Sequence, residues 1–481
     1  MAPHRSNGAR RPCGWRTVSP HDGVRAPLRA PGAVLLVSCY ELGRQPVGLA
    51  FPLAFLERAG FAPCAVDLAV ELLDEAAVRR ARLVALSVPM HTALTIGVRA
   101  AERIRALNPD AAMCFYGLYA LLNREHLLAQ GADAVFGGES EEQLVEAARR
   151  LERGEPLESP AAHLARLDFP VPSRDNLPPL TRYAHLERDG VRVSAGSVEA
   201  SRGCLHRCLH CPITPVYGGR FFVVPRAVVL EDIRRQVAFG ARHITFVDPD
   251  FLNGPRHSLR IAEALHGEFP DFTFDFTAKI EHLIARRALL PRLAALGCAF
   301  VVSAVESLSD EVLRNLDKGH TRADVARALD LVRSAGLALR PSLLPFTPWS
   351  TLDDYVELVE WVANEDLVEC VDPVQLAIRL LIPPGSALLQ RSEIRPFLAG
   401  LDRGAFTYVW RHPAPRMERL YRTVSGIVHA ASHAGEATAG TFRRVRAAAY
   451  EAREESAPAE AAATLAERRP VPPRLTEPWF C

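Results

Sequence analysis

Short apolar segments alternate with segments of helical periodicity along most of this 481-residue chain, and this alternation constrains its fold more than any other feature. Continuously apolar strands with helices between them are typical of parallel sheets covered on both faces. The first part of the chain therefore predicts a doubly wound, flavodoxin-like parallel sheet. Its expected strands are Ala33–Ser38, Cys64–Ala69, Leu83–Pro89, Ala111–Gly117 and Ala132–Gly138.

A second alternation begins near Val198, after a proline-rich stretch that includes "DFPVPSRDNLPPL". Six strand–helix steps are too few to close an eight-stranded barrel, so we expect an open, partial (β/α)6 barrel. Its chemistry should lie at the carboxyl ends of the strands. The expected strands are Val198–Ser201, His243–Asp248, Phe272–Ala278, Ala299–Val305, Ala338–Leu344 and Pro373–Ile382.

The length of the chain indicates more than one domain. The predicted α/β organisation has six consecutive regions, which differ in periodicity and proline content. They are a disordered tail (1–32), the first sheet (33–155), a linker (156–197), the partial barrel (198–393), a helical region (394–468) and an extended tail (469–481).

Charge and composition exclude several kinds of partner. The chain has 57 basic and 56 acidic residues, a formal net charge of +1, so bulk charge favours neither nucleic acid nor a membrane surface. It has no apolar run of the ~20 residues that a membrane span needs, and its N-terminus has no apolar block of the kind that secretory signals carry. Most of the ten cysteines are scattered, which favours reduced, buried thiols in a cytoplasmic protein.

Three cysteines are instead clustered in "ASRGCLHRCLHCPITPVYGGR" (Ala200–Arg220), directly after the first expected barrel strand. Cys204, Cys208 and Cys211 have the spacing C-x3-C-x2-C. Zinc would need a fourth ligand, which His206 or His210 could supply only by crowding one turn. Three thiolates suit a 4Fe–4S cluster better, because they leave one iron open to a substrate or cosubstrate. We therefore favour a cluster and keep structural zinc as the alternative.

This motif, at the end of the first strand of a partial barrel, resembles that of the radical S-adenosylmethionine enzymes, roughly over Val198–Ile394. The resemblance implies that Cys204, Cys208 and Cys211 hold the cluster and that S-adenosylmethionine chelates its fourth iron. An electron from a donor such as flavodoxin or ferredoxin would then yield a 5′-deoxyadenosyl radical that abstracts a substrate hydrogen.

The resemblance also suggests residues that contact S-adenosylmethionine. His210 stands where the family usually has an aromatic residue near the adenine, although a solvated histidine is the alternative. Asp248 and Asp250, in "FVDPDF", end the second strand and are candidates to bind the methionyl ammonium. Equally, they could cap the next helix.

Two further positions follow from the fourth and fifth strands. "SAVES" resembles the family's "GVES", so Glu306 is expected to contact S-adenosylmethionine. Arg340 could reach its carboxylate or be paired structurally. "DKGHT" (Asp317–Thr321) is interpreted mainly as a helix C-cap at Gly319, with a role in the site as the alternative.

The first sheet resembles the cobalamin-binding module that often precedes such barrels, with "GESEEQ" resembling the module's "GEGE" ending. The candidate cobalamin-binding residues are Ser87, Gly117, Gly137 and Glu139. The loop "CYELGRQPVG" has no histidine where some modules carry D-x-H-x-x-G, so cobalt ligation by a protein histidine is not expected. Cobalamin without a protein ligand, or a relic domain, are both open.

The tail "RLTEPWFC" resembles a narrower radical S-adenosylmethionine group whose C-terminus continues as Cys-Cys-Ala-Glu-Pro or Cys-selenocysteine-Ala-Glu-Pro. This suggests that the chain is truncated at a selenocysteine codon and that Cys481 belongs to a redox tail. A frayed terminus with an exposed thiol is the alternative.

The sequence thus predicts an enzyme that cleaves S-adenosylmethionine with a 4Fe–4S cluster. With cobalamin, methyl transfer is the favoured reaction. Without it, cyclisation, rearrangement or sulfur insertion are alternatives, and a non-enzymatic metal or thiol scaffold is the runner-up.

Overall fold

The computed structural model describes residues 27–457 and 471–477. Its first sheet is wholly parallel, with strand order β2-β1-β3-β4-β5. Every residue of β1 and β3 is buried, as expected for strands covered on both faces. The predicted flavodoxin-like sheet is confirmed, with strands β1 (Val34–Ser38), β2 (Cys64–Asp67), β3 (Leu83–Ser87), β4 (Ala112–Tyr116) and β5 (Ala134–Phe136).

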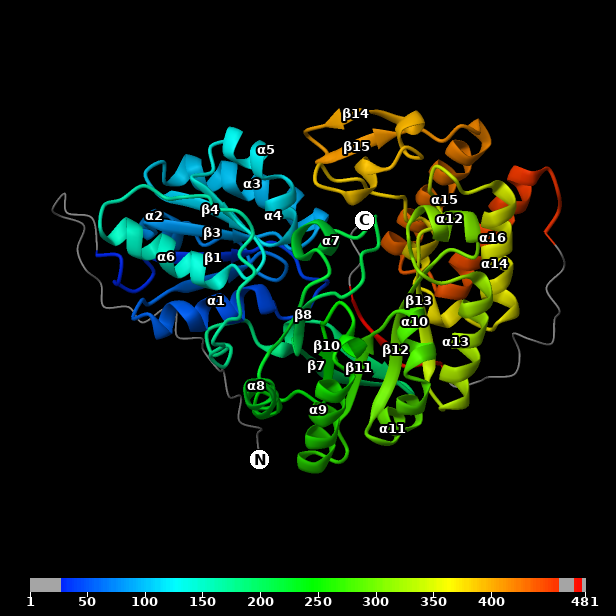
Figure 1. Ribbon diagram of the computed structural model, residues 1–481, viewed down its shortest axis with the longest axis horizontal. Helices are drawn as coiled ribbons and strands as arrows, with labels where there is room; N and C mark the ends of the chain where they lie inside the picture. The colour runs from blue at the N-terminus through cyan, green and yellow to red at the C-terminus, as the bar shows by residue number, and fades with distance from the viewer. Residues whose placement is uncertain (1–26, 458–470, 478–481) are drawn as a thin grey trace, which may run out of the picture.

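Helices cover both faces of this sheet (Figure 1). One face packs against α1 and α6, in a core continuous with that of the barrel, and the other packs against α2, α3 and α5. The helices are α1 (Val47–Arg58), α2 (Glu75–Arg80), α3 (His91–Leu107), α4 (Leu118–Leu122), α5 (Arg124–Ala129) and α6 (Glu141–Glu152).

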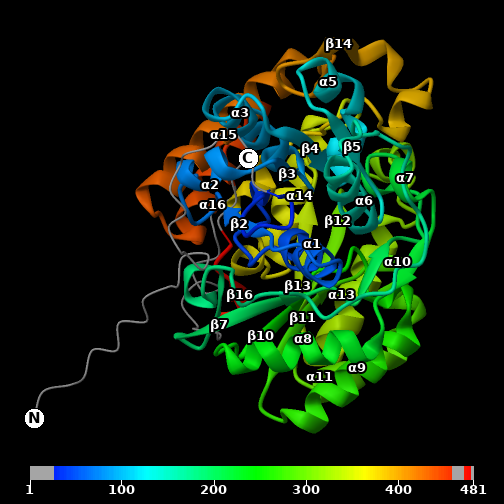
Figure 2. The same ribbon diagram turned by 90° about the vertical axis from the view of Figure 1, so that its left-hand side faces the viewer.

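The second sheet is the partial barrel, with order β13-β12-β11-β10-β7-β6-β16, and it lies below the first sheet in Figure 2. Five of its strands are parallel: β7 (Val191–Val198), β10 (His243–Phe246), β11 (Thr273–Thr277), β12 (Cys298–Glu306) and β13 (Ala338–Leu343). The helices between and after them are α8 (Arg226–Ala238), α9 (Pro255–Glu268), α10 (Ile280–Ala285), α11 (Leu290–Ala295), α12 (Asp310–Asn315), α13 (Arg322–Ser334) and α14 (Leu352–Asn364).

The barrel differs from the sequence prediction at both ends. The expected sixth strand, Pro373–Ile382, begins as a 3-10 turn (Pro373–Leu376) and contributes only one bridge, from Arg379 to Phe346. Two prolines close to its ends, Pro373 and Pro383, favour turns over a paired strand. The expected first strand also shifts, because β7 ends at Val198 and Ser201–Gly203 forms β8, which pairs with β9 (Phe221–Val223).

Residues expected to form the linker complete the barrel edge. β6 (His185–Arg188) and β7 form an antiparallel hairpin across the turn Asp189–Gly190, and both turn residues have positive φ. The tail strand β16 (Arg474–Leu475) pairs with β6, while Glu477 lies 2.6 Å from the Nε of Arg44 in the first domain.

The C-terminal region contains two long helices, α15 (Pro415–Ala434) and α16 (Thr438–Arg453), which pack on each other and on α14. They are preceded by a hairpin that the sequence reading did not anticipate, β14 (Leu398–Asp402) and β15 (Thr407–Trp410). Phe406 of this hairpin is buried in the core of the first domain.

A buried polar network joins the first domain to the barrel. Arg174 lies 2.6 and 2.9 Å from the two carboxylate oxygens of Asp232, and donates to Gln45 at 2.8 Å and to the Ser197 carbonyl at 2.7 Å. Gln45 precedes α1, Ser197 lies on β7 and Asp232 lies on α8. Because an unpaired buried charge is costly, this network fixes the two domains together.

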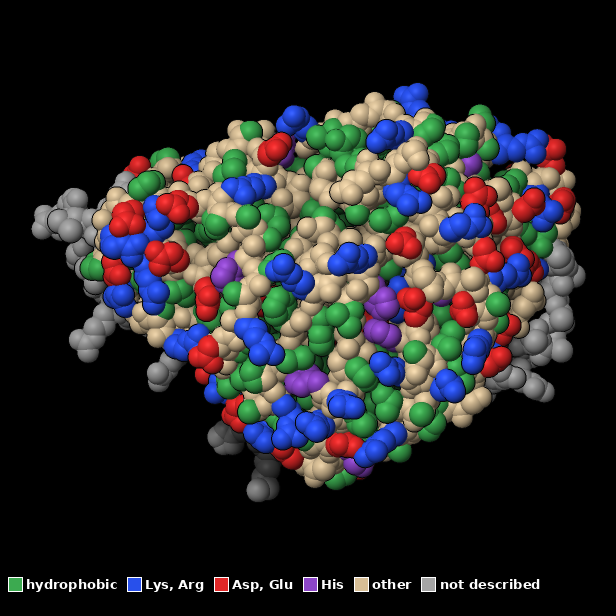
Figure 3. Space-filling view, viewed as in Figure 1, with side chains coloured by type: hydrophobic (Ala, Val, Ile, Leu, Met, Phe, Trp, Pro, Cys, Tyr) green, Lys and Arg blue, Asp and Glu red, His purple; other side chains and the backbone are tan. Residues whose placement is uncertain are grey.

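The remaining expectations concern the cysteines and the surface. Cys64 is disulfide-bonded, so the prediction of reduced thiols throughout is wrong at that position. Within residues 27–457 and 471–477, helices that combine the length and the apolar character of a membrane span are absent. Basic and acidic side chains are interspersed over the face seen in Figure 3.

Candidate active site

The three cysteines lie on the segment that joins β8 to α7 (Ile213–Tyr217), at the carboxyl end of the barrel strands. The segment leaves β8 at Gly203, whose φ is +71° and where a Cβ would lie 2.4 Å from the carbonyl oxygen of Arg220, so glycine is required there. The amide of Leu209 donates to the carbonyl of Leu316 at 2.9 Å. The motif is therefore anchored to the turn that follows α12.

All three thiols are free, and their arrangement suits a cluster. Cys204 and Cys208 are buried and Cys211 is half-buried. Burial raises the pKa of the Cys211 thiol to about 12, and the other two cysteines add to this effect, as expected of neighbouring sulfurs. Zinc binds thiolates at about 2.3 Å, which would bring the sulfurs of one site within about 4 Å of one another.

The cysteine sulfurs are farther apart than a single zinc ion requires. Among the residues that the structure describes, the group of three potential ligands with donor atoms within 4.8 Å of one another is His206, Asp250 and His282, not the cysteines. Three separated thiols suit a cluster in which each sulfur binds a different iron. The donor set therefore fits a 4Fe–4S cluster better than structural zinc.

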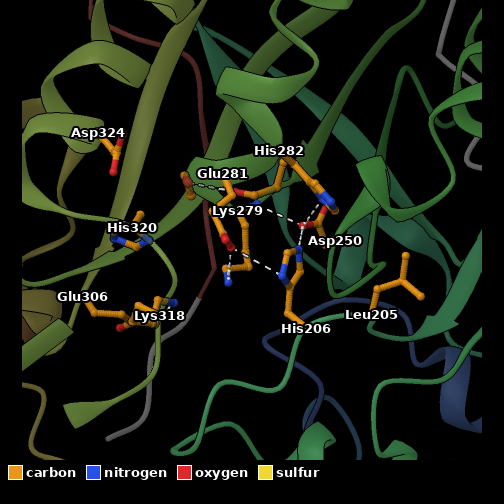
Figure 4. Close-up of polar contacts among 12 residues, drawn as sticks. Leu205, His206, Asp250, Lys279, Glu281, His282, Glu306, Lys318, His320 and Asp324 are labelled. Carbon is orange, nitrogen blue, oxygen red and sulfur yellow. Dashed lines mark hydrogen bonds and ion pairs between the residues drawn. The ribbon is translucent and has the colours of Figure 1, made fainter. Parts of the chain in front are cut away.

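Glu306 ends β12 with a φ of +63° and faces the cysteine segment. Its Oε1 lies 3.2 Å from the Nζ of Lys318, which lies beside it in Figure 4, and 3.3 Å from the Nε2 of His210. Burial would raise the pKa of Glu306, but Lys318 and His210 outweigh it and lower the pKa to about 2. Glu306 and His210 therefore form one group, with an ionised carboxylate at neutral pH.

Lys318 was not among the predicted site residues, since "DKGHT" favoured a helix cap. The turn does form, with positive φ at Asp317 and Gly319, but it buries Lys318 to 2% exposure beside Glu306. Burial lowers the pKa of Lys318, yet Glu306 and the thiols of Cys208 and Cys211 outweigh it and raise the pKa. The sequence did carry one signal for this residue, because Lys318 is one of only two lysines in the chain.

The two aspartates after β10 both stabilise local structure. Asp248 accepts hydrogen bonds from the Ala200 amide at 2.9 Å and from the Ser201 hydroxyl, and burial raises its pKa to about 7. Asp250 accepts from the amides of Leu252 at 2.9 Å and Lys279 at 3.1 Å. Both hold the strand ends that support the cysteine segment.

Arg340 is directed elsewhere. Its guanidinium contacts the carbonyls of Glu369 at 3.3 Å and Pro473 at 3.4 Å and lies 3.5 Å from Asp372. The structure therefore gives Arg340 the structural partners that the sequence left open and does not bring it to Glu306.

A cavity of about 300 Å³ lies where the carboxyl edge of the first sheet meets the start of the barrel. In an open parallel sheet this edge, near the switch point between β1 and β3, is where ligands bind. Two of the candidate cobalamin-binding residues, Ser87 and Gly117, line this cavity. Its other lining residues include Glu41, Gly138, Glu141, Glu199, Arg202 and Tyr217.

The two remaining cobalamin candidates are held in contacts within the protein. Gly137 packs against Leu121, where a Cβ would lie 2.7 Å away. Glu139 is fully buried, 3.1 Å from Arg202 and 3.0 Å from the hydroxyl of Tyr217, which donates to it. Arg202 also bridges Glu141 at 2.7 Å and Glu199 at 2.6 Å.

Glu41 is one of the lining residues that sequence reasoning missed. Its carboxylate accepts from the amides of Val47 at 3.0 Å and Gly48 at 3.1 Å, and so caps the N-terminus of α1. Burial, with Asp67 nearby, raises the pKa of Glu41 to about 8. The position that often binds a ligand anion in such sheets is thus occupied by the protein's own carboxyl group.

The expectations for Cys481 and the selenocysteine codon concern the C-terminus beyond Glu477, which lies outside the described residues.

Comparison with known proteins assigns a family to the barrel. Residues 198–362 match the model of the Radical SAM superfamily. The chain is 25% identical over 190 residues to the hopanoid C-3 methylase of Methylococcus capsulatus, covering 40% of this chain and 36% of the relative. It is 25% identical over 264 residues to a tRNA-2-methylthio-N(6)-dimethylallyladenosine synthase of Thermotoga petrophila, covering 51% and 54%. The chain thus spans about a third to a half of these relatives.

Two solved structures share the fold over more of the chain. The cobalamin-dependent S-adenosylmethionine radical enzyme OxsB, with aqua-cobalamin bound, superimposes with a TM-score of 0.64 at 15% identity, covering 83% of this chain and 67% of that one. The radical S-adenosylmethionine methyltransferase TsrM of Kitasatospora setae, with cobalamin and a [4Fe-4S] cluster bound, gives 0.56 at 18% identity, covering 69% and 73%. At these identities the likeness establishes the shared fold.

Proposed function

Because residues 198–362 form a radical SAM domain, we propose that this enzyme cleaves S-adenosylmethionine reductively and uses the resulting radical to abstract a hydrogen from its substrate. The observation that carries the proposal is the trio Cys204, Cys208 and Cys211, free and separated on one segment at the carboxyl end of the barrel strands. When bound, a 4Fe–4S cluster supplies the electron for this cleavage.

The protein's own residues prepare the site for a charged cosubstrate. The three thiols must lose their protons to bind iron, and the Lys318 ammonium favours that loss at Cys211. Glu306 remains ionised because its pKa is about 2, so it can accept hydrogen bonds from an ammonium or a hydroxyl group. Asp248 and Asp250 position the segment through the backbone contacts described above.

The same proposal includes a flavodoxin or ferredoxin in the cytoplasm as the donor of the electron used to cleave S-adenosylmethionine. No nucleic acid or membrane partner is proposed. The formal net charge of +1 supports that choice.

Anaerobic reconstitution with iron and sulfide tests the proposal. We expect an absorbance band near ~400 nm and release of 5′-deoxyadenosine when reductant and S-adenosylmethionine are added. A colourless protein that binds zinc through the cysteines and releases no 5′-deoxyadenosine would support the scaffold alternative and contradict the proposal.

A second candidate is cobalamin-dependent methyl transfer, favoured by the cavity at the carboxyl edge of the first sheet and by the shared fold with OxsB and TsrM. The fit is incomplete. The cavity of about 300 Å³ is at the lower end of the roughly 300–1,000 Å³ typical of sites for drug-sized ligands, and a corrinoid is much larger. Cobalamin would require the first sheet and the barrel to move apart.

Incubation of the purified protein with hydroxocobalamin, followed by gel filtration, distinguishes the two candidates. Retention of one corrinoid per chain would support methyl transfer. If no corrinoid is retained, the result favours a radical reaction that does not use cobalamin, such as cyclisation, rearrangement or sulfur insertion.

A further inference from the structure

Three possible metal ligands converge beside the cysteine segment but are not part of the cysteine trio. His206 lies between Cys204 and Cys208, Asp250 follows β10, and His282 lies on α10 after β11. Their donor atoms all lie within 4.8 Å of one another. Figure 4 shows the two imidazoles on either side of the Asp250 carboxylate.

The distances approach those of a coordination sphere. The Nδ1 of His282 is hydrogen-bonded to the Oδ2 of Asp250 at 2.8 Å, and the Nε2 of His206 is 3.9 Å from the same oxygen. Ligands that bind zinc at about 2.0–2.2 Å in a tetrahedral site lie about 3.3–3.6 Å apart. An ion would therefore replace the proton between His282 and Asp250 and require both imidazoles to shift by about half an ångström, while the Oδ1 of Asp250 keeps its bond to the Leu252 amide.

His206 supplies the second observation. Its Nε2 is buried and has no hydrogen-bond partner, although it faces Asp250. Its Nδ1 lies 3.4 Å from the Oε2 of Glu281. A neutral imidazole carries one proton, so either tautomer directs a lone pair at a carboxylate. A cation at Nε2, with the Nδ1 proton directed at Glu281, removes this conflict, and metal-bound histidines commonly have such a carboxylate partner.

We propose that His206, Asp250 and His282 bind a divalent transition-metal ion, zinc or ferrous iron, separately from the cluster. Two imidazoles and one carboxylate favour these ions over magnesium or calcium. The ammonium of Lys279 acts against positive charge at His206, but its pairing with Glu281 at 2.5 Å offsets part of this effect. The side chains of His206 and His282 are 19% and 15% exposed, so an ion and a water ligand can enter from solvent.

The ion would link three elements: the cysteine segment and the ends of β10 and β11. It would thus add a further tie to the segment, in which the amide of Leu209 is already bonded to Leu316.

Zinc is the probe because it binds such sites more tightly than ferrous iron, so a failure to bind zinc counts clearly against the site. Protein with a fully reconstituted cluster is treated with a chelator, dialysed anaerobically against micromolar zinc and analysed for zinc, iron and sulfide. We expect one zinc per chain with iron and sulfide unchanged. His282→Gln and His206→Gln should each lower the zinc affinity at least about tenfold, whereas His266→Gln, on the last turn of α9, should not.

X-ray absorption at the zinc edge identifies the ligands independently of any activity. Nitrogen and oxygen neighbours at about 2.0–2.2 Å support the site, and sulfur at about 2.3 Å would place the zinc on the cysteines and overturn it. Wild-type protein that retains no zinc, or equal retention in the His282→Gln variant, would also overturn it. Each result stands whether or not S-adenosylmethionine is cleaved.

Discussion

The carboxyl edges of the two parallel sheets both carry polar groups but use them differently. At the first sheet, Glu41 caps α1, and Arg202 pairs with Glu139, Glu141 and Glu199. At the barrel, three thiols are free and the Nε2 of His206 lacks a partner. The charges of the first edge are paired by its own side chains, although the Oε2 of Glu141 has no hydrogen-bond partner, whereas the barrel edge offers thiols and an imidazole nitrogen that can bind a ligand.

The difference supports the proposal that the barrel edge is the chemical centre, with the first edge as a wall of the cavity. Buried polar groups that are fully paired stabilise one arrangement of the chain. Unpaired donors at a strand end are costly unless a ligand compensates for them. Substitutions at the two edges should therefore differ in effect, with loss of ligand binding at the barrel edge and loss of stability at the first edge.

The largest effect is expected at the barrel edge. Cys208→Ala should remove the cluster and lower 5′-deoxyadenosine release by at least ~100-fold, because three thiolates are needed to leave only one iron open. Cys370→Ala, at another buried free cysteine, is the matched control and should retain iron. Iron analysis and quantification of 5′-deoxyadenosine check both variants. If Cys208→Ala retained a full cluster, the barrel edge would not be the edge that binds a ligand.

At the first edge, Arg202→Met should act on stability. It leaves Glu139, Glu141 and Glu199 without their shared partner and removes the stacking of the guanidinium on Phe51 at 4.9 Å. Breaking a buried ion pair from one side costs about 3–5 kcal/mol. Urea unfolding measures this cost. Arg153→Met, at an exposed ion pair at the C-cap of α6, should cost far less stability. If the two variants lost equal stability, the side chains at the first edge would not form a paired network.

Lys318→Met tests whether charge at the barrel edge serves the cosubstrate. Without the ammonium the pKa of Glu306 should rise from about 2, so the variant should bind S-adenosylmethionine more weakly as the pH falls. The wild type should show no such dependence above pH ~4. We expect a loss of about tenfold in affinity, the size of one charge-assisted hydrogen bond. Binding isotherms at several pH values check this, with the exposed Arg314→Met as control.

The last prediction concerns Glu41, and the size of its effect depends on the pH at which stability is measured. With a pKa of about 8 in the folded chain and 4.5 as its ordinary value, this carboxyl holds a proton only in the folded state across that interval. Stability should therefore fall as the pH rises from 4.5 to 8, by up to ~1.4 kcal/mol per pH unit. Glu41→Gln should flatten that slope and Glu146→Gln, exposed on α6, should not. An unchanged slope would mean that Glu41 is already ionised.

The features of the molecule that depend on local sequence pattern could be predicted from the sequence. Apolar strands predicted both sheets, and the spacing of Cys204, Cys208 and Cys211 predicted the chemistry, because each is encoded within a few residues. The pairing of β16 with β6 and the burial of Phe406 of the β14–β15 hairpin in the first domain could not be predicted, since both depend on contacts across the chain.

The same limit applies to the site. Glu306 could be identified from "SAVES", but its partner Lys318 is brought to it by a turn that sequence reasoning treated as a cap. The trio His206, Asp250 and His282 comes from three separate elements, and nothing in the linear spacing links them.

The central claim is that the three cysteines bind a cluster with one iron left open for S-adenosylmethionine. Mössbauer spectroscopy of the protein reconstituted with ⁵⁷Fe tests it most directly. The account predicts that a single iron of the cluster changes its signal when S-adenosylmethionine is added. Four irons that remain unaffected, or a protein that assembles no cluster, would contradict it.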